Sequence, residues 1–157
     1  MKRILSGGLV MFGVVAAPLS FSPHQTRPSP PADYREDPRL QSLRSFFGKG
    51  NCPAKEFAEA FLQAADKYDL DWRLLPSLSW VESTGGKLAR NNNFFGWDSG
   101  KAEFTSVTAG IHAVGYRLAN SSLYKNKGLD ELLATYNPDV EYAPRVKAVM
   151  RRISAVE

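Results

Sequence analysis

The chain has 157 residues, 43% of them hydrophobic and 23% charged, a composition typical of globular proteins rather than of disordered ones. Its formal net charge is +4, but no run of Lys and Arg is interleaved with aromatic residues, which argues against nucleic-acid binding. The single cysteine, Cys52, excludes an internal disulfide, so the hydrophobic core alone must stabilise the fold.

The first residues have the order of a secretory signal. Lys2 and Arg3 precede an apolar run from Ile4 to Ala17, and small residues follow. We therefore expect residues 1–22 to be a signal peptide and the protein to be exported, to the periplasm or to the extracellular medium. The run is shorter than the roughly 20 apolar residues that cross a bilayer, although an uncleaved N-terminal anchor is the alternative. No later stretch predicts a transmembrane segment in the mature chain.

A proline-rich stretch follows the signal. Residues 23–38 contain five prolines and almost nothing apolar, which predicts an extended linker. Residues 39–157 then form one domain of ordinary size, without an internal repeat.

This domain is predicted to be all-α, because its apolar residues recur at helical spacing and no alternating strand pattern is evident. Pro76 falls deep inside one expected helix, so the start of that helix is placed only to within two or three residues. Residues 87–104 form the longest stretch without a periodic pattern, and long loops of this kind often carry function. The expected helices begin near Pro53 and then span Asp71 to about Thr84, 106–119, 129–136 and 142–156.

Glu82 has an unusual position for a charged side chain. At 100° per residue it falls on the apolar face of its helix with Leu75 and Leu78. Burial disfavours a charged carboxylate, so the pKa of Glu82 should be raised. A protonated carboxyl can donate a proton to the leaving oxygen of a glycoside. The structural alternative is that this side chain, near the helix end, reaches solvent or pairs with an arginine.

Three motifs follow one another in this part of the chain. The segment from Tyr68 to Ser83 is similar to a helix that ends in a catalytic glutamate and a serine, residues 91–97 read Asn-Asn-Asn-Phe-Phe-Gly-Trp, and residues 135–146 combine a Tyr-Asn turn with a following helix. Their order resembles the lysozyme-like superfamily, in particular the exported glucosaminidases and the soluble lytic transglycosylases. The resemblance covers about Ala54 to Ile153, nearly the whole domain.

The resemblance implies a lysozyme-like helical domain, with a long substrate loop and little or no sheet, that cleaves peptidoglycan glycan strands as an N-acetylglucosaminidase. It implies Glu82 as the general acid and Tyr136 as the tyrosine that approaches it. No cofactor is expected, and two histidines cannot assemble a metal site. The substrate-binding residues that it implies are Ser83, Asn93, Phe94, Phe95, Gly96 and Trp97.

Structural explanations remain open for several of these side chains. Ser83 could cap the end of its helix instead of holding a sugar, and the asparagines could be turn formers. Tyr136 could be buried for packing. Trp80 and Tyr116, which lie at helical spacing, are expected in the core.

Departures from the family patterns leave the reaction open. The transglycosylases carry a Gly-Leu-Met-Gln type of segment where this chain has Phe95-Gly96-Trp97-Asp98. The second acid of a glucosaminidase could correspond only to Asp98 or Glu103. A lytic transglycosylase, which forms anhydro-muramyl ends with one glutamate, is therefore the alternative enzyme. A non-catalytic peptidoglycan-binding module is the third possibility.

Overall fold

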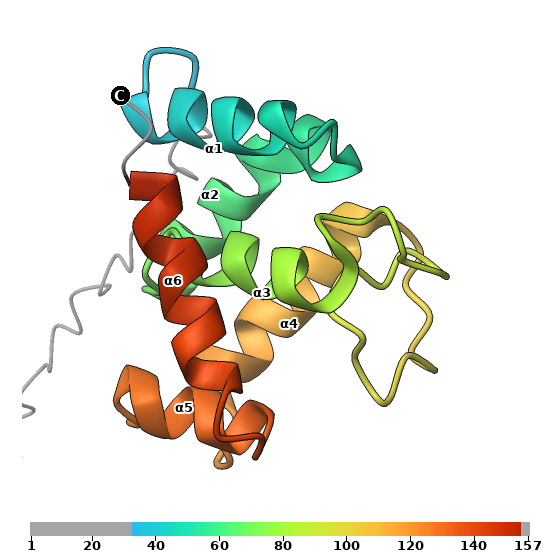
Figure 1. Ribbon diagram of the computed structural model, residues 1–157, viewed down its shortest axis with the longest axis vertical. Coiled ribbons are helices and arrows are strands. Elements are labelled where there is room, and N and C mark those ends of the chain that lie inside the picture. Colours follow the sequence, from blue (N-terminus) through green and yellow to red (C-terminus); the bar gives the residue numbers. More distant parts are fainter. Residues whose placement is uncertain (1–32, 155–157) are drawn as a thin grey trace, which may run out of the picture. The chain divides into compact units, whose positions relative to one another are not determined.

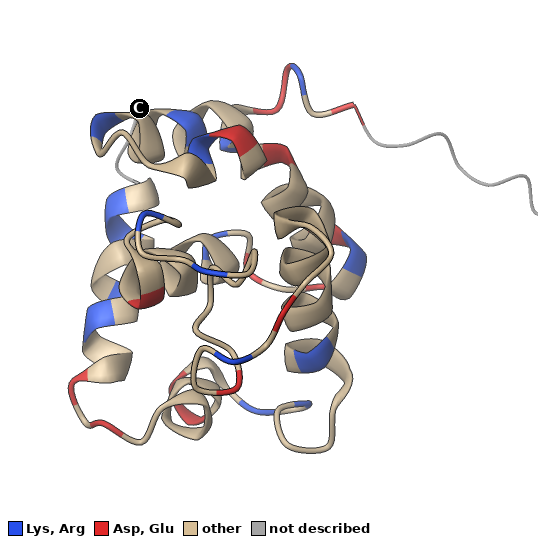
Figure 2. Cartoon of the chain, turned by 90° about the vertical axis from the view of Figure 1, so that its right-hand side faces the viewer, with Lys and Arg blue, Asp and Glu red and all other residues tan. Residues whose placement is uncertain are grey.

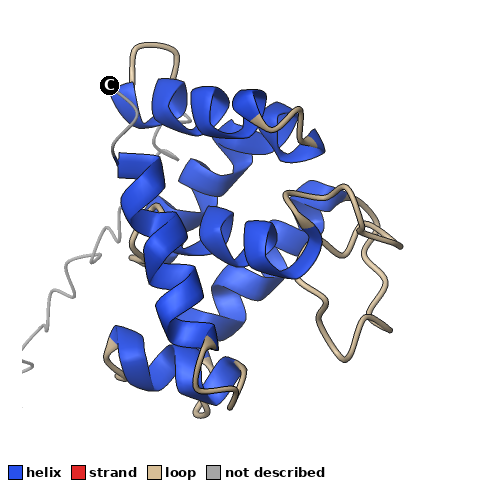
Figure 3. Ribbon diagram, viewed as in Figure 1, coloured by secondary structure: helices blue, strands red, loops and turns tan. Residues whose placement is uncertain are grey.

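The computed structural model describes residues 33–154. The expected signal peptide and most of the expected linker lie outside these residues. Within them the helices carry no accompanying strand, so the domain is all-α as predicted (Figure 3). An isolated bridge pairs Arg90 with Asn93. No helix of the described part is long and apolar enough to cross a membrane.

The helices pack in pairs around a common core (Figure 1). Helix α2 packs chiefly on α4, and α3 packs chiefly on α6, whereas α1 covers α2 and a short 3-10 helix. In Figure 1, α1 lies at the top, α5 at the bottom, and α6 runs between them beside α3. The elements are α1 (Pro38–Lys49), the 3-10 helix η1 (Pro53–Phe57), α2 (Ala58–Tyr68), α3 (Leu74–Ser83), α4 (Val107–Asn120), α5 (Leu129–Tyr136) and α6 (Tyr142–Ser154).

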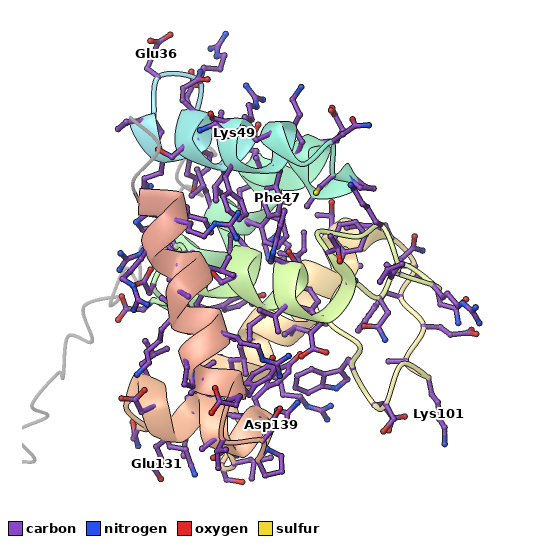
Figure 4. The ribbon with its side chains drawn as sticks, in the orientation of Figure 1. Glu36, Phe47, Lys49, Lys101, Glu131 and Asp139 are labelled. Atoms are coloured by element: carbon purple, nitrogen blue, oxygen red, sulfur yellow. The ribbon has the colours of Figure 1, made fainter. Side chains whose placement is uncertain are left out.

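Helix α1 was not among the expected helices. The Asp37 carboxylate caps it by accepting a hydrogen bond from the Arg39 N–H at 2.8 Å, and Pro38 occupies the first turn, where its missing N–H costs nothing. Its buried stripe includes Phe47, which points from α1 into the domain (Figure 4). The rest of this stripe is Leu40, Leu43 and Phe46.

The folded domain also begins earlier than the predicted boundary at residue 39. Tyr34 is only 6% exposed, and its hydroxyl donates a hydrogen bond to Asp66 of α2 at 2.9 Å. Arg39 forms an ion pair with the same carboxylate at 2.7 Å. The last residues assigned to the linker therefore belong to the fold.

The later helices agree closely with the prediction. Helix α5 has the predicted bounds, and α4 begins one residue late because Ser106 is its N-cap, accepting from the Ala109 N–H at 3.0 Å. The helix expected near Pro53 starts as η1 and continues as α2. Helix α3 begins at Leu74, three residues later than expected. Pro76 is then in the first turn, where no intrahelical N–H bond is lost.

Helix α3 ends abruptly, which sends the chain into the predicted loop. Thr84 and Gly85 adopt left-handed φ values of 52° and 62°, and the Thr84 N–H donates to the Trp80 carbonyl. The segment from there to Ser106 contains no helix and projects to one side of α3 and α4 (Figure 1). Glu82 therefore lies where a rigid helix meets the long loop.

Candidate active site

Glu82 lies in the last turn of α3 and borders a cleft of about 630 Å³. The side chain is half-buried. Residues 95–99 of the long loop, Arg117 of α4 and Tyr136 at the end of α5 form the other walls. A cleft of this size suits a small-molecule or oligomeric ligand, and a carboxyl group with restricted solvation lies in it.

Tyr142 contacts one oxygen of the Glu82 carboxyl. The phenol hydroxyl donates a hydrogen bond of 2.6 Å to Glu82 Oε1, and the Tyr142 side chain is buried. Burial raises the pKa of Glu82, and this effect exceeds the lowering by the Tyr142 hydrogen bond and by the charge of Arg145. Burial and the neighbouring carboxyl also raise the pKa of Tyr142, so its hydroxyl stays protonated as a donor. The carboxyl thus favours its acid form more than an exposed glutamate does.

Gly96 lies against the other carboxyl oxygen. Its φ is +57°, and a Cβ at this position would stand 3.1 Å from Glu82 Oε2. Both the backbone conformation and the narrow space favour glycine. Gly96 therefore leaves the acid accessible from the cleft.

Four aromatic rings form a row along the cleft. Tyr142 stacks on Tyr136 with ring centroids 5.8 Å apart, and Tyr136 contacts Trp97 edge-on at 5.6 Å. Trp97 also contacts Tyr124, at 6.3 Å. We refer to Tyr124, Trp97, Tyr136 and Tyr142 as the aromatic row. Three of its members border the cleft, which gives the acid an apolar wall on one side.

The structure assigns Tyr136 a different contact from the predicted one. Its ring borders the cleft, but its hydroxyl donates to the Phe95 carbonyl at 2.8 Å rather than to Glu82. Burial raises the pKa of Tyr136, and the neighbouring Glu82 adds to this. The tyrosine that contacts the carboxyl is Tyr142, which sequence reasoning used only as the start of a helix. Tyr136 instead fixes the backbone beside Gly96.

Ser83, which the resemblance implies for substrate binding, makes structural contacts and does not border the cleft. It is 3% exposed, its Oγ lies 2.7 Å from the Phe94 carbonyl oxygen, and it accepts from the Gly86 N–H at 3.0 Å. These contacts join the end of α3 to the long loop. Its proton is donated to a backbone carbonyl and its side chain is buried, so Ser83 does not face the cleft.

Asn93 and Phe94 also belong to the interior rather than to the substrate surface. The Asn93 amide nitrogen donates to the carbonyls of Trp97 and Ala102, and its oxygen accepts from the Trp97 N–H at 2.9 Å. Phe94 is 4% exposed and packs edge-on against Phe57. Asn93 therefore shapes the loop that presents Gly96 and Trp97.

The three remaining residues of the expected substrate-binding set all border the cleft. Phe95 borders it but has its side chain in the core, whereas Gly96 and Trp97 face it. Asp98, one of the two possible second acids, also borders it and is exposed. The other, Glu103, accepts a hydrogen bond from Asn91 at 3.2 Å and does not border it.

Side chains that were expected in the core divide into two groups. Trp80 packs on Phe46 and Phe47, as expected. Tyr116 is 59% exposed, so its assignment to the core was wrong.

The Cys52 thiol is buried, and burial raises its pKa. The described residues contain no group of three His, Cys, Asp or Glu side chains able to hold a metal ion.

In comparisons with known proteins, no family model, no curated protein and no solved structure matches the chain.

Proposed function

We propose that this protein is an exported peptidoglycan glycan-strand hydrolase of the N-acetylglucosaminidase type, with Glu82 as its general acid. One observation carries the proposal. The Glu82 carboxyl is half-buried, accepts a hydrogen bond from Tyr142 and opens onto a cleft with aromatic walls. The signal-like N-terminus supports export. The resemblance of the motifs supports peptidoglycan as the substrate.

The proposed chemistry uses the protonated form of Glu82. The carboxyl donates its proton to the glycosidic oxygen while the bond from that oxygen to the anomeric carbon breaks, and the alcohol leaves. Water then adds to the anomeric carbon and gives up a proton to the second carboxylate, Asp98, which borders the same cleft. Tyr142 stabilises the carboxylate that forms, because its hydroxyl already donates to Oε1.

The walls of the cleft fit a sugar ligand. Sugars present flat apolar faces and rims of hydroxyl groups, and they bind where aromatic surfaces lie beside polar groups. The cleft offers the rings of Trp97 and Tyr136 together with the polar side chains of Asn137 and Ser99. Gly96 allows a ligand to approach the carboxyl closely.

One observation favours the lytic transglycosylase instead. Among the described carboxylates that border the cleft, only Glu82 is half-buried, because Asp98 is exposed on the loop. A single glutamate can act first as acid and then as base, activating the 6-hydroxyl of the muramyl residue in place of water. The glucosaminidase reaction would use Asp98 as its second carboxylate.

Mass spectrometry of fragments released from purified sacculi tests these alternatives. Fragments with reducing N-acetylglucosamine ends support the proposal, and anhydro-muramyl ends support the transglycosylase. Sacculi that bind the protein but release no fragments point to a binding module. A Glu82→Gln variant is the control, because it keeps the size of the side chain and loses the acid, so it should release no fragments.

A further inference from the structure

We propose that Arg117 and a second hollow beside it bind a carboxylate-bearing peptide branch of the glycan, so that the enzyme prefers acidic, substituted strands to neutral ones. The inference rests on the proposed function and specifies which part of the substrate the protein recognises. It is carried by the position of Arg117, by its lack of an ion-pair partner and by the lining of the hollow.

Arg117 is exposed, and its guanidinium contacts an aromatic ring rather than an acid. It belongs to α4, borders the cleft that contains Glu82, and places its guanidinium 5.6 Å from the centre of the Trp97 ring. No carboxylate within residues 33–154 forms an ion pair with it. By contrast, Arg145 is paired with Asp139 at 3.0 Å. The guanidinium is thus oriented while its charge remains available.

A second hollow, of about 520 Å³, lies next to the cleft. Trp97, Ala102 and Arg117 border both, so a ligand that extends from one to the other passes the guanidinium. The rest of the lining is partly apolar and partly polar, and consists of Phe104, Ala113, Val114, Tyr116, Asn120 and Ser121. Tyr116, which is exposed, is one of the residues that border this hollow.

The charges around the two sites favour an anionic substituent. Arg117 is the one charged residue among those lining the second hollow. Asp98 borders only the cleft, and Lys101 points away from the domain at the tip of the loop (Figure 4). Elsewhere basic residues lie on α1 and α6 and acidic residues on α5, so charge is spread over several helices (Figure 2). Among the residues that line the hollow, the guanidinium of Arg117 therefore supplies the one formal charge, and it is positive.

Peptidoglycan supplies a matching group. Every second sugar carries a lactyl ether that is either a free carboxylate or the start of a short peptide with carboxylates of its own. A guanidinium binds a carboxylate through two parallel N–H···O bonds, which a neutral polymer of N-acetylglucosamine cannot offer. With the sugar in the cleft, the branch would pass Arg117 and enter the second hollow.

Binding measurements in the Glu82→Gln background, which keeps ligands intact, test the role of Arg117. The probes are a disaccharide carrying a tetrapeptide, the same disaccharide with a free lactyl carboxylate, and neutral chitotetraose. Adding Arg117→Gln should weaken both acidic ligands by about tenfold at low salt and chitotetraose by less than about twofold. Arg44→Gln on exposed α1 is the control for charge alone and should change none of them. Equal weakening of all three probes, or none, overturns the inference.

A substitution that fills the second hollow tests whether the hollow binds the peptide or whether only the lactyl carboxylate is recognised. Ala113→Trp, on the exposed side of α4 within the hollow, should weaken the tetrapeptide ligand by at least about fivefold and leave the free disaccharide unchanged. Ala134→Trp on exposed α5 is the matched control. Retained tetrapeptide binding would show that the hollow does not hold the peptide. If the unmodified protein cleaves sacculi while these variants show no discrimination, only this inference fails; if it neither binds nor cleaves them, the proposed function fails.

Discussion

The hydroxyl of Tyr142 donates a 2.6 Å hydrogen bond to Glu82, although the two residues are 60 positions apart. The contact exists because α6 packs along α3, which brings the start of the last helix to the end of the third. Arg145, one turn further along α6, lies 5.8 Å from the centre of the Tyr142 ring. The C-terminal helix therefore positions the carboxyl that we assign as the acid.

Changing Tyr142 to Phe should lower kcat by about tenfold or more, because the carboxyl loses its orienting partner and the carboxylate loses a donor. The hydrogen bond from Tyr142 lowers the pKa of Glu82, so its removal raises that pKa further. Activity needs the protonated acid, and the alkaline limb of the pH–rate profile should therefore move to higher pH. Steady-state kinetics over pH measures both effects. An unchanged limb with normal turnover would show that the hydrogen bond does not tune the acid.

Tyr136→Phe is the matched comparison. The Tyr136 hydroxyl donates to the Phe95 carbonyl, so the variant should lose about 1 kcal/mol of stability. The alkaline limb of its pH–rate profile should stay at the pH found for the unmodified protein. Thermal melting and the same pH series measure this. A shifted limb in Tyr136→Phe with no shift in Tyr142→Phe would restore the role that the sequence assigned to Tyr136.

Replacing Glu82 by Gln should reduce cleavage by at least about 10²-fold and stabilise the fold. Since burial raises the pKa of Glu82 above its usual 4.5, the folded state holds this proton more tightly than the unfolded state does. Glu82 therefore costs stability at neutral pH, and this cost disappears as the pH falls below 4.5. The variant should melt a few degrees higher near pH 7 and lose the advantage near pH 4. A variant that melts lower at every pH would contradict this linkage.

Local patterns predicted the helices well where the signals were unambiguous. The bounds of α5 and the start of α6 could be read from apolar spacing and turn residues. Helix α1 had signals too, since Asp37 and Pro38 form a capped first turn and the apolar spacing is helical. Because prolines precede it, the start of α1 was predicted to belong to the linker. Tyr34 gave no local signal, because its burial depends on Asp66 of α2.

The candidate site was predictable only in part. The apolar face of α3 identified Glu82, since the periodicity of one helix suffices for that. Tyr142 could not be assigned, because its contact depends on how α3 and α6 pack. The burial of Ser83 and Asn93 was not predictable, because a loop of this length needs buried polar side chains to satisfy its backbone, and a motif does not separate that role from ligand binding.

The position of Tyr34 predicts where the chain can be shortened. A chain starting at Asp33 should keep the melting temperature of the domain, whereas one starting at Arg39 loses the Tyr34 contact with Asp66 and the Asp37 cap. We expect the shorter chain to lose about 2–3 kcal/mol, from a helix cap and a buried aromatic side chain. Denaturant melts of the two chains compare them. Equal midpoints would show that residues 33–38 contribute nothing to the fold.

Substitutions at Gly96 and Gly100 distinguish two effects on activity, the blocking of access to Glu82 and the strain of the loop backbone. Both have positive φ, +57° and +80°, so alanine at either should cost about 1 kcal/mol of stability. Only at Gly96 does the new Cβ approach Glu82, at 3.1 Å from Oε2, whereas nothing lies within 4 Å of a Cβ at Gly100. Gly96→Ala should therefore lower kcat by at least about tenfold, because the methyl group displaces the carboxyl or blocks the approach of the glycosidic oxygen.

Gly100→Ala should melt earlier by a similar amount and cleave sacculi at close to the normal rate. Activity is compared at a temperature where both variants remain folded, as judged by their melting curves. If both lose activity equally, strain in the loop rather than access to Glu82 controls turnover. If neither loses it, the space beside Oε2 is not where the substrate approaches, and Glu82 is not the acid that this geometry indicates.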